Sequence, residues 1–391
     1  MEPPPYALTE EQEWFRDTVR RLAQERVAPR AADIDRTGTF PWDIAELFAE
    51  AGLLGLGLPE EWGGGGADLL TLALAIEEVA KVCATSSLII AAQHLGALPI
   101  VIAGTRAQQA LFLPDLASGR KLAAFALTEP EAGSDAGHVQ MRAVRDNDRY
   151  WLSGTKAFIT NGGLAKTLVV FASCDPQKGA RGMTAFVVDG DAAGLTVGRI
   201  EDKMGIRGSQ TATLYFDHVA VPVEQRLGDE GEGFKIAMQT LDRTRLGIAA
   251  QALGIAEGAF LATVDHLTHR RQFGRPLIEQ EAIQFMVADM ATRIEASRQL
   301  LYKACAVAER AGLASHANPE VSRFSAMAKL FCSETAMRVT TDAVQLFGGY
   351  GYLRDYPVER MMRDAKITQI YEGTNQIQRL VIFRNLLTKE T

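Results

Sequence analysis

The residue with the clearest catalytic potential is a single carboxylate near the C-terminal end of the chain. Glu372 stands between an aromatic residue, Tyr371, and a glycine, Gly373. Glycine permits a sharp turn and a close approach of the backbone to a ligand. Thr374 then occupies the N-cap position of a helix predicted over 374–387. We interpret Glu372 as a candidate general base held on a turn, although a solvated loop glutamate would read the same way.

Three further segments carry side chains suited to binding a ligand. They are the polar loop 128–135 (TEPEAGSD), the basic and aromatic segment 270–274 (RRQFG) and the glycine-rich turn 345–352 (QLFGGYGY). Together with the turn at Glu372, and in this order, they resemble the acyl-CoA dehydrogenase family. Each motif alone is a weak match, but the resemblance extends over essentially the whole chain.

Composition excludes several other classes of function. The 391 residues have a net charge of −7, so a nucleic-acid partner is not expected. The four cysteines are scattered without a CxxC pair and the six histidines lack metal-ligand spacing, so no metal site is predicted. Acidic residues interrupt the apolar run 69–80, which argues against a membrane span. The start of the chain lacks a secretory signal. These features favour a bacterial-type cytoplasmic protein, and a mature mitochondrial matrix chain would look the same.

Apolar periodicity divides the chain into three parts. We expect a mainly α protein with a central β-domain: an N-terminal helical domain over 1–120, a middle β-domain over 121–232 and a C-terminal helical domain over 233–391. The resemblance implies that the middle domain is β-barrel-like and that the C-terminal domain is a four-helix bundle. The helices are predicted at 11–27, 69–82, 88–101 (interrupted near Pro99), 234–269, 281–311, 320–347 and 374–387. The strands are predicted at 167–172, 184–188 and 211–216. Glycines at 247, 254 and 258 are expected to allow close helix packing.

The resemblance implies a fold, a cofactor and a reaction. The fold is that of the acyl-CoA dehydrogenases, the cofactor is FAD, and an acyl-CoA is desaturated to a trans-2-enoyl-CoA. Glu372 removes the α-proton while the β-hydrogen leaves as hydride to the flavin. The backbone N–H of Glu372 polarises the thioester carbonyl together with a flavin hydroxyl. Some members place the base on the long helix instead, but this chain has no obvious glutamate beside Arg245, which favours Glu372.

The resemblance also implies which residues contact the flavin. Arg270 suits a pyrophosphate because its guanidinium is permanently charged. One departure occurs at 280–281, where many relatives have an aromatic residue and glutamine, so no contact is assigned to Glu281. The implied cofactor contacts are Phe125, Thr128, Ser134, Phe158, Thr160, Arg270, Phe273, Gln280, Gln345, Gly348, Gly349, Thr374 and Gln376.

A second set of residues is implied to contact the substrate. A polar Gln251 and a Thr368 match positions where short-chain and short branched-chain members carry these residue types, so we expect a short acyl pocket. Asp242 and Arg245 lie one helical turn apart, and a surface ion pair is the alternative interpretation of that spacing. The implied substrate contacts are Ser134, Asp242, Arg245, Gln251, Thr368, Tyr371, Gly373 and Arg384.

The resemblance implies two protein partners. Electrons pass to an electron-transfer flavoprotein, and the chain assembles as a homotetramer because the flavin site takes residues from two subunits. Three alternatives remain open at this point. They are an acyl-CoA oxidase, a catalytically idle flavoprotein scaffold, and a helical CoA-binding protein without redox chemistry. The oxidase is disfavoured because the extra C-terminal domain of many oxidases is lacking.

Overall fold

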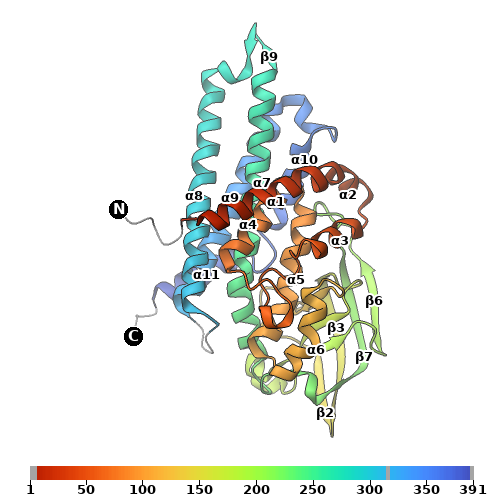
Figure 1. Ribbon diagram of the computed structural model, residues 1–391. Coiled ribbons are helices and arrows are strands. Elements are labelled where there is room, and N and C mark those ends of the chain that lie inside the picture. The colour runs from red at the N-terminus through yellow and green to blue at the C-terminus, as the bar shows by residue number, and fades with distance from the viewer. Residues whose placement is uncertain (1–6, 314–317, 388–391) are drawn as a thin grey trace.

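Two helical regions pack together and a β-sheet domain lies beside them in the computed structural model, which describes residues 7–313 and 318–387 (Figure 1). The predicted fold class, mainly helical with a central β-domain, is confirmed. The outer ends of the predicted domains 1–120 and 233–391, and residues 314–317 of the predicted loop between helices, lie outside the described residues.

The N-terminal region consists of helices whose starts are fixed by polar side chains. Its helices are α1 Glu10–Leu22, α2 Ala31–Thr37, α3 Trp42–Glu50, α4 Leu69–Ala80, α5 Ala84–Ala103 and α6 Arg106–Ala117. Thr9 and Gln12 form a reciprocal capping box at the start of α1. Two predictions need correction. The helix expected over 11–27 changes to a π-helical turn at Ala23, and α5 runs through Pro99 without interruption.

The central sheet has the strand order β6-β7-β3-β2-β4-β5-β8, with β1 paired to β4 in parallel. The predicted strands are confirmed as β4, β5 and part of β7. β1, β2, β3, β6 and β8 are not among the predicted strands. The bounds are β1 Ala123–Ala126, β2 Arg142–Asp146, β3 Arg149–Thr160, β4 Thr167–Ser173, β5 Met183–Asp189, β6 Leu195–Ile200, β7 Thr211–Pro222 and β8 Arg226–Leu227.

Long helices form the C-terminal region. They are α7 Gly233–His269, α8 Glu281–Ala311, α9 Pro319–Phe347, α10 Pro357–Ile367 and α11 Asn375–Leu386. α10 is not among the predicted helices. α7 and α8 form a hairpin whose tip carries the short strands β9 Arg271–Gln272 and β10 Arg275–Pro276, far from the β-domain (Figure 1).

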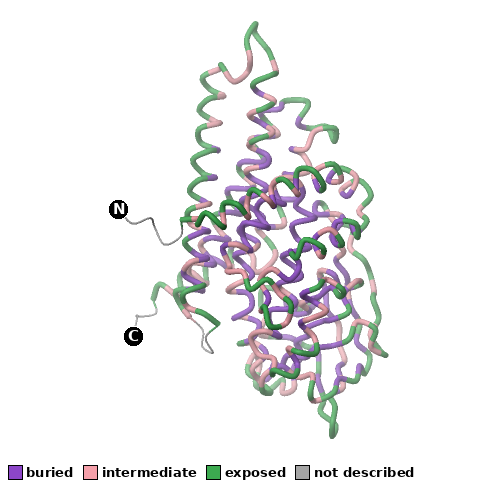
Figure 2. Tube along the Cα trace, viewed as in Figure 1, coloured by how far each residue is buried: buried purple, intermediate pink, exposed green. Residues whose placement is uncertain are grey.

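The core runs through α4, α5, α7 and α9, where buried residues concentrate (Figure 2). By length and composition α5 and α7 could each cross a membrane, a property that is not among the features predicted from the sequence. However, 78% and 67% of their most apolar windows are buried inside the fold. Two glycines let α7 approach the backbone of α4 and of the turn that follows it. A Cβ on Gly254 would clash with the carbonyl oxygen of Glu77 in α4, and a Cβ on Gly258 would clash with that of Lys81 in the turn. The predicted close packing at these glycines is therefore confirmed.

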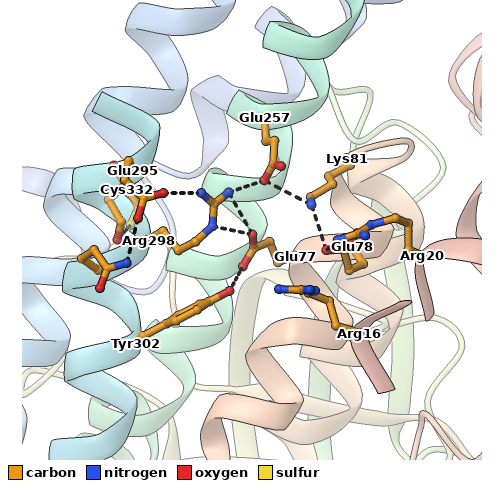
Figure 3. A network of polar contacts seen from close by, with 12 residues as sticks. Arg16, Arg20, Glu77, Glu78, Lys81, Glu257, Glu295, Arg298, Tyr302 and Cys332 are labelled. Carbon is orange, nitrogen blue, oxygen red and sulfur yellow. Dashed lines mark hydrogen bonds and ion pairs between the residues drawn. The ribbon is translucent and has the colours of Figure 1, made fainter. Parts of the chain in front are cut away.

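A buried network of charges joins α4, α7 and α8 (Figure 3). Glu77 of α4 lies 3.4 Å from the guanidinium of Arg298 and accepts a hydrogen bond of 3.2 Å from the Tyr302 hydroxyl. Glu257 of α7 pairs with Arg298 and, at 3.1 Å, with Lys81. Burial raises the pKa of Glu77 above its ordinary value. The network fixes the packing of the helices that carry the candidate site.

Candidate active site

The predicted sharp turn at Glu372 is present between α10 and α11. Glu372 has φ +51° and Gly373 has φ +90°, so two consecutive residues are in left-handed conformations. The positive φ of Gly373 explains the glycine, because other residues rarely adopt it, and a Cβ there would also lie 2.6 Å from the side-chain nitrogen of Gln378. The Thr374 hydroxyl accepts a hydrogen bond of 3.3 Å from the Ile377 N–H, so Thr374 caps α11 as predicted.

Side chains from two helices hold the carbonyl groups of this turn. Gln378 of α11 donates to the carbonyl oxygens of Glu372 at 3.1 Å and Gly373 at 2.8 Å. Arg245 of α7 donates to the Glu372 carbonyl at 3.2 Å and pairs with Asp242 at 2.7 Å. The ion pair that the spacing of Asp242 and Arg245 suggested is therefore present. It is buried rather than on the surface, since the Arg245 side chain is 4% exposed.

The electrostatic environment prepares Glu372 to accept a proton near neutral pH. Burial raises the pKa of the Glu372 carboxyl from its ordinary value to about 7. The Thr244 hydroxyl donates a hydrogen bond of 2.8 Å to the carboxylate and opposes this rise, as do the nearby cations of Arg245 and Lys329. A carboxylate with these properties suits general base catalysis.

A pocket with a volume of about 550 Å³ opens in front of Glu372. Its wall combines apolar side chains of α5, α7 and α11 with hydroxyl groups from the β-domain. Many of the residues predicted from the resemblance meet here. Those that line the pocket are Phe125, Thr128, Ser134, Phe158, Thr160, Arg245, Tyr371, Glu372, Gly373 and Arg384.

The β-domain side of the pocket fits a flat, acceptor-rich ring such as a flavin. Thr128, Ser134 and Thr160 bring hydroxyl donors to it, and Phe125 and Phe158 bring aromatic rings. Phe158 has φ +57° at a register shift in the pairing of β3 with β7, and its side chain is 65% exposed. Strain of this kind persists where the surroundings fix it, commonly at ligand sites.

A buried ion pair that the sequence motifs do not reveal fixes the loop that carries Thr128. The ammonium of Lys156 donates to the carboxylate of Glu129 at 2.8 Å and to the Leu127 carbonyl at 2.9 Å. The same carboxylate accepts from the Met141 N–H at 3.0 Å. Burial lowers the pKa of Lys156 to about 8. In the sequence, both charges read as ordinary surface residues.

Other predicted cofactor residues gather far from this pocket, around the α7–α8 hairpin tip. At a rise of 1.5 Å per residue, α7 extends roughly 37 Å from Arg245 to Arg270. A second hollow of about 370 Å³ is lined there by Arg270, Gln345, Gly348 and Gly349. Phe273 nearby is 93% exposed. One copy of the chain therefore does not bring the two sets together.

The remaining predicted cofactor residues have local roles near the hairpin or on α11. The side-chain oxygen of Gln280 accepts a hydrogen bond of 2.8 Å from Arg275, close to the hairpin tip. Thr374 is committed to capping α11, and Gln376 is exposed on the first turn of that helix. None of these three is among the described residues that line the pocket in front of Glu372.

Gln251 and Thr368 are also not among the described residues that line the pocket. Gln251 is fully buried and donates to the Ala84 carbonyl at 2.9 Å, while its side-chain oxygen accepts from the Tyr371 hydroxyl. The Thr368 hydroxyl donates to the Ala365 carbonyl at 2.7 Å. Gln251 therefore reaches the pocket through Tyr371, and the expected effect of both residues on chain length stays a prediction.

Comparison with known proteins agrees with this geometry. The chain matches the acyl-CoA dehydrogenase N-terminal domain over residues 9–120, the middle domain over 124–219 and the C-terminal domain over 231–387. It is 48% identical to an acyl-CoA dehydrogenase of Clostridium acetobutylicum described as short-chain specific, over 96% of this chain and 98% of the relative.

Solved structures show the same similarity. Butyryl-CoA dehydrogenase from Megasphaera elsdenii has a TM-score of 0.94 and 46% identity, covering 99% of this chain and 100% of the other. A chain in a structure described as the electron transferring flavoprotein of Acidaminococcus fermentans has a TM-score of 0.94 and 48% identity, covering 100% of both chains. The chain therefore belongs to the acyl-CoA dehydrogenase family of flavin-dependent oxidoreductases.

Proposed function

We propose that this protein is an FAD-dependent acyl-CoA dehydrogenase that converts a short straight- or branched-chain acyl-CoA to its trans-2-enoyl-CoA. The observation that carries the proposal is the Glu372 carboxylate, which faces a pocket with a flavin-compatible wall and has a pKa raised to about 7. An ionised carboxylate of that basicity can remove the weakly acidic α-proton of a thioester.

The placement of the pocket residues supports the roles that the family resemblance implies for them. Glu372 takes the α-proton on its carboxylate, and its backbone N–H is assigned to polarise the thioester carbonyl. A flavin, when bound, would supply the acceptor for the β-hydrogen, which leaves as hydride. Thr128, Thr160 and Phe158 would hold the flavin ring, while Ser134 and Arg384 are assigned to the CoA part of the substrate.

The apolar part of the pocket suits the alkyl part of an acyl group. The apolar side chains of Leu88, Ala92 and Leu95 on α5 line it, so a small alkyl group would be held by non-polar contacts. Two of the relatives above carry short-chain or butyryl in their descriptions, which supports the same assignment.

We infer that the active form is a homotetramer. The residues assigned to the ADP half of FAD lie at the hairpin tip, so a second subunit would have to bring them to the pocket. Large apolar side chains are exposed on α8, α9 and α11, among them Phe285, Phe331 and Phe383, and offer surface for association.

We also propose that electrons pass from the reduced flavin to an electron-transfer flavoprotein, and we place the enzyme in the cytoplasm.

Anaerobic titration of the purified protein with a panel from butyryl-CoA to palmitoyl-CoA, including branched members, tests the proposal. Short acyl-CoAs should bleach the flavin absorbance and yield enoyl-CoA, identified by mass. Bleaching by long chains alone would contradict the substrate assignment. Rapid reoxidation of the bleached protein by oxygen, faster than by an electron-transfer flavoprotein, would indicate an oxidase instead. A flavin-loaded protein that no acyl-CoA bleaches would indicate a scaffold.

A further inference from the structure

A buried ammonium lies behind the catalytic turn. Lys329 of α9 is 0% exposed. Its ammonium donates to the carbonyl oxygen of Gly373 at 2.9 Å and to the side-chain oxygen of Asn375 at 3.1 Å. The hydroxyl of Ser333, one turn further along α9, donates to the same Asn375 oxygen at 3.1 Å. Two residues of the turn are therefore tied to α9 through one cation.

This arrangement is unusual because the two acceptors are neutral. Burying a cation is unfavourable unless a carboxylate or several hydrogen bonds compensate it. In the part of the chain that the structure describes, Lys329 forms no ion pair at salt-bridge distance. Burial lowers the pKa of Lys329 to about 7, the carboxylate of Glu372 opposes this shift, and the cation of Arg245 adds to it. Packing alone would be served better by a methionine or leucine, so the ammonium calls for another explanation.

We propose that Lys329 is a positioning residue of the active site, whose ammonium holds the Gly373 carbonyl and so keeps Glu372 facing the substrate. This inference rests on the proposed function. A left-handed φ at a non-glycine residue such as Glu372 persists only where surrounding contacts fix it. Arg245 and Gln378 hold the Glu372 carbonyl, whereas Lys329 and Gln378 hold the Gly373 carbonyl.

The position of Lys329 separates its role from substrate binding. It is not among the described residues that line the pocket, whereas Arg245 lines it. Loss of Lys329 should therefore change the rate of proton removal much more than the affinity for acyl-CoA. A misplacement of about 1 Å at a reacting group can slow a reaction about 100-fold.

The ammonium also biases the charge of the base. A nearby cation favours the ionised carboxylate, so its removal should raise the pKa of Glu372. The other charged groups around the turn are Arg245 and its partner Asp242 on α7, which remain in place. On α11, Arg379 is paired with Glu334 of α9.

The test compares Lys329→Met with the wild type and with Thr340→Val. Thr340 is fully buried on the same helix, and its hydroxyl donates to the Ala336 carbonyl, so this variant controls for a change within α9. Three quantities are measured: the anaerobic bleaching rate from about pH 6 to pH 9, the dissociation constant of butyryl-CoA, and amide hydrogen exchange of the peptide spanning 370–378.

For Lys329→Met we expect bleaching about 10- to 100-fold slower at pH 7, a pH midpoint moved upward, faster exchange in the peptide and an almost unchanged dissociation constant. Thr340→Val should match the wild type in all three. Wild-type bleaching rates and an unmoved pH midpoint in Lys329→Met would overturn the inference.

Lys329→Gln decides the question if the methionine variant does not fold. It keeps a donor and removes the charge, so the bleaching rate should fall at pH 7 and recover at high pH. A rate equal to that of the wild type at pH 7 would overturn the inference. If the wild type itself is not bleached by any acyl-CoA, the proposed function fails, and the exchange of the peptide still reports whether Lys329 holds the turn.

Discussion

Replacing Thr244 by valine should make the catalytic carboxylate harder to ionise. The hydroxyl of Thr244, on α7, donates a hydrogen bond of 2.8 Å to the carboxylate of Glu372. Valine has nearly the same shape, so this buried position stays filled while the donor is lost. Because the bond stabilises the charged form of Glu372, its loss should raise the pKa of the base.

The size of the effect can be worked from this contact. A hydrogen bond to a charged group contributes about 1.5–3 kcal/mol, and a change of one pKa unit corresponds to about 1.4 kcal/mol. Arg245 and Lys329 continue to favour the ionised form, so we take the lower end and expect a rise of about one unit. With a pKa moving from about 7 to about 8, the ionised fraction at pH 7 falls from about one half to about one tenth.

The assay is the rate of anaerobic flavin bleaching by butyryl-CoA as a function of pH. The variant should be about fivefold slower at pH 7 and indistinguishable from the wild type above about pH 9. Thr263→Val is the matched control, because the buried Thr263 hydroxyl lies on the same helix and donates to the Ala259 carbonyl. A pH midpoint that is the same in Thr244→Val and in the wild type would refute the account of the base.

Three further predictions concern cofactor retention and stability. Arg270→Leu should weaken FAD retention about 10- to 100-fold, as expected for a lost charged contact to phosphate. Retention is measured as flavin absorbance after dialysis. Unchanged retention would contradict a flavin site that takes residues from two subunits. Lys156→Met should leave Glu129 buried without its cation and lower the free energy of unfolding by about 3–5 kcal/mol, measured by denaturant titration against the wild type. Burial raises the pKa of Glu77 to about 7 in the folded state. The stability that its protonated form contributes is therefore present below about pH 4.5 and is lost as pH rises through about 7. In Glu77→Gln the fall of Tm between those pH values should be flatter than in the wild type. Parallel curves of Tm against pH for the two proteins would argue against this expectation.

The elements predicted correctly from the sequence are those whose signals are local. The long helices α7, α8 and α9 carry sustained apolar periodicity, and the turn at Glu372 is marked by glycine and a threonine cap. β1 and β3 escape this reasoning because their strand character depends on pairing with distant partners.

The candidate site shows the same division. Glu372 and the hydroxyls of the pocket wall belong to recognisable motifs, and most of them meet in the structure. The burial of Lys329, Glu129 and Lys156 is not predicted, because a charged residue in the sequence is interpreted as solvent-exposed until the fold buries it. The position of Gln251 behind Tyr371 likewise depends on which helix faces it, which sequence spacing does not specify.

The role of Glu372 as the base is best tested by anaerobic mixing of butyryl-CoA with the flavin-loaded Glu372→Gln variant, followed at the flavin absorbance maximum. Glutamine keeps the size and the contacts of the side chain but cannot accept the α-proton. Glu334→Gln, on the exposed face of α9, serves as the control for loss of one carboxylate. We expect that Glu372→Gln binds butyryl-CoA and stays yellow while the wild type and the control are bleached. Bleaching of Glu372→Gln at the wild-type rate would contradict the assignment of Glu372 as the base.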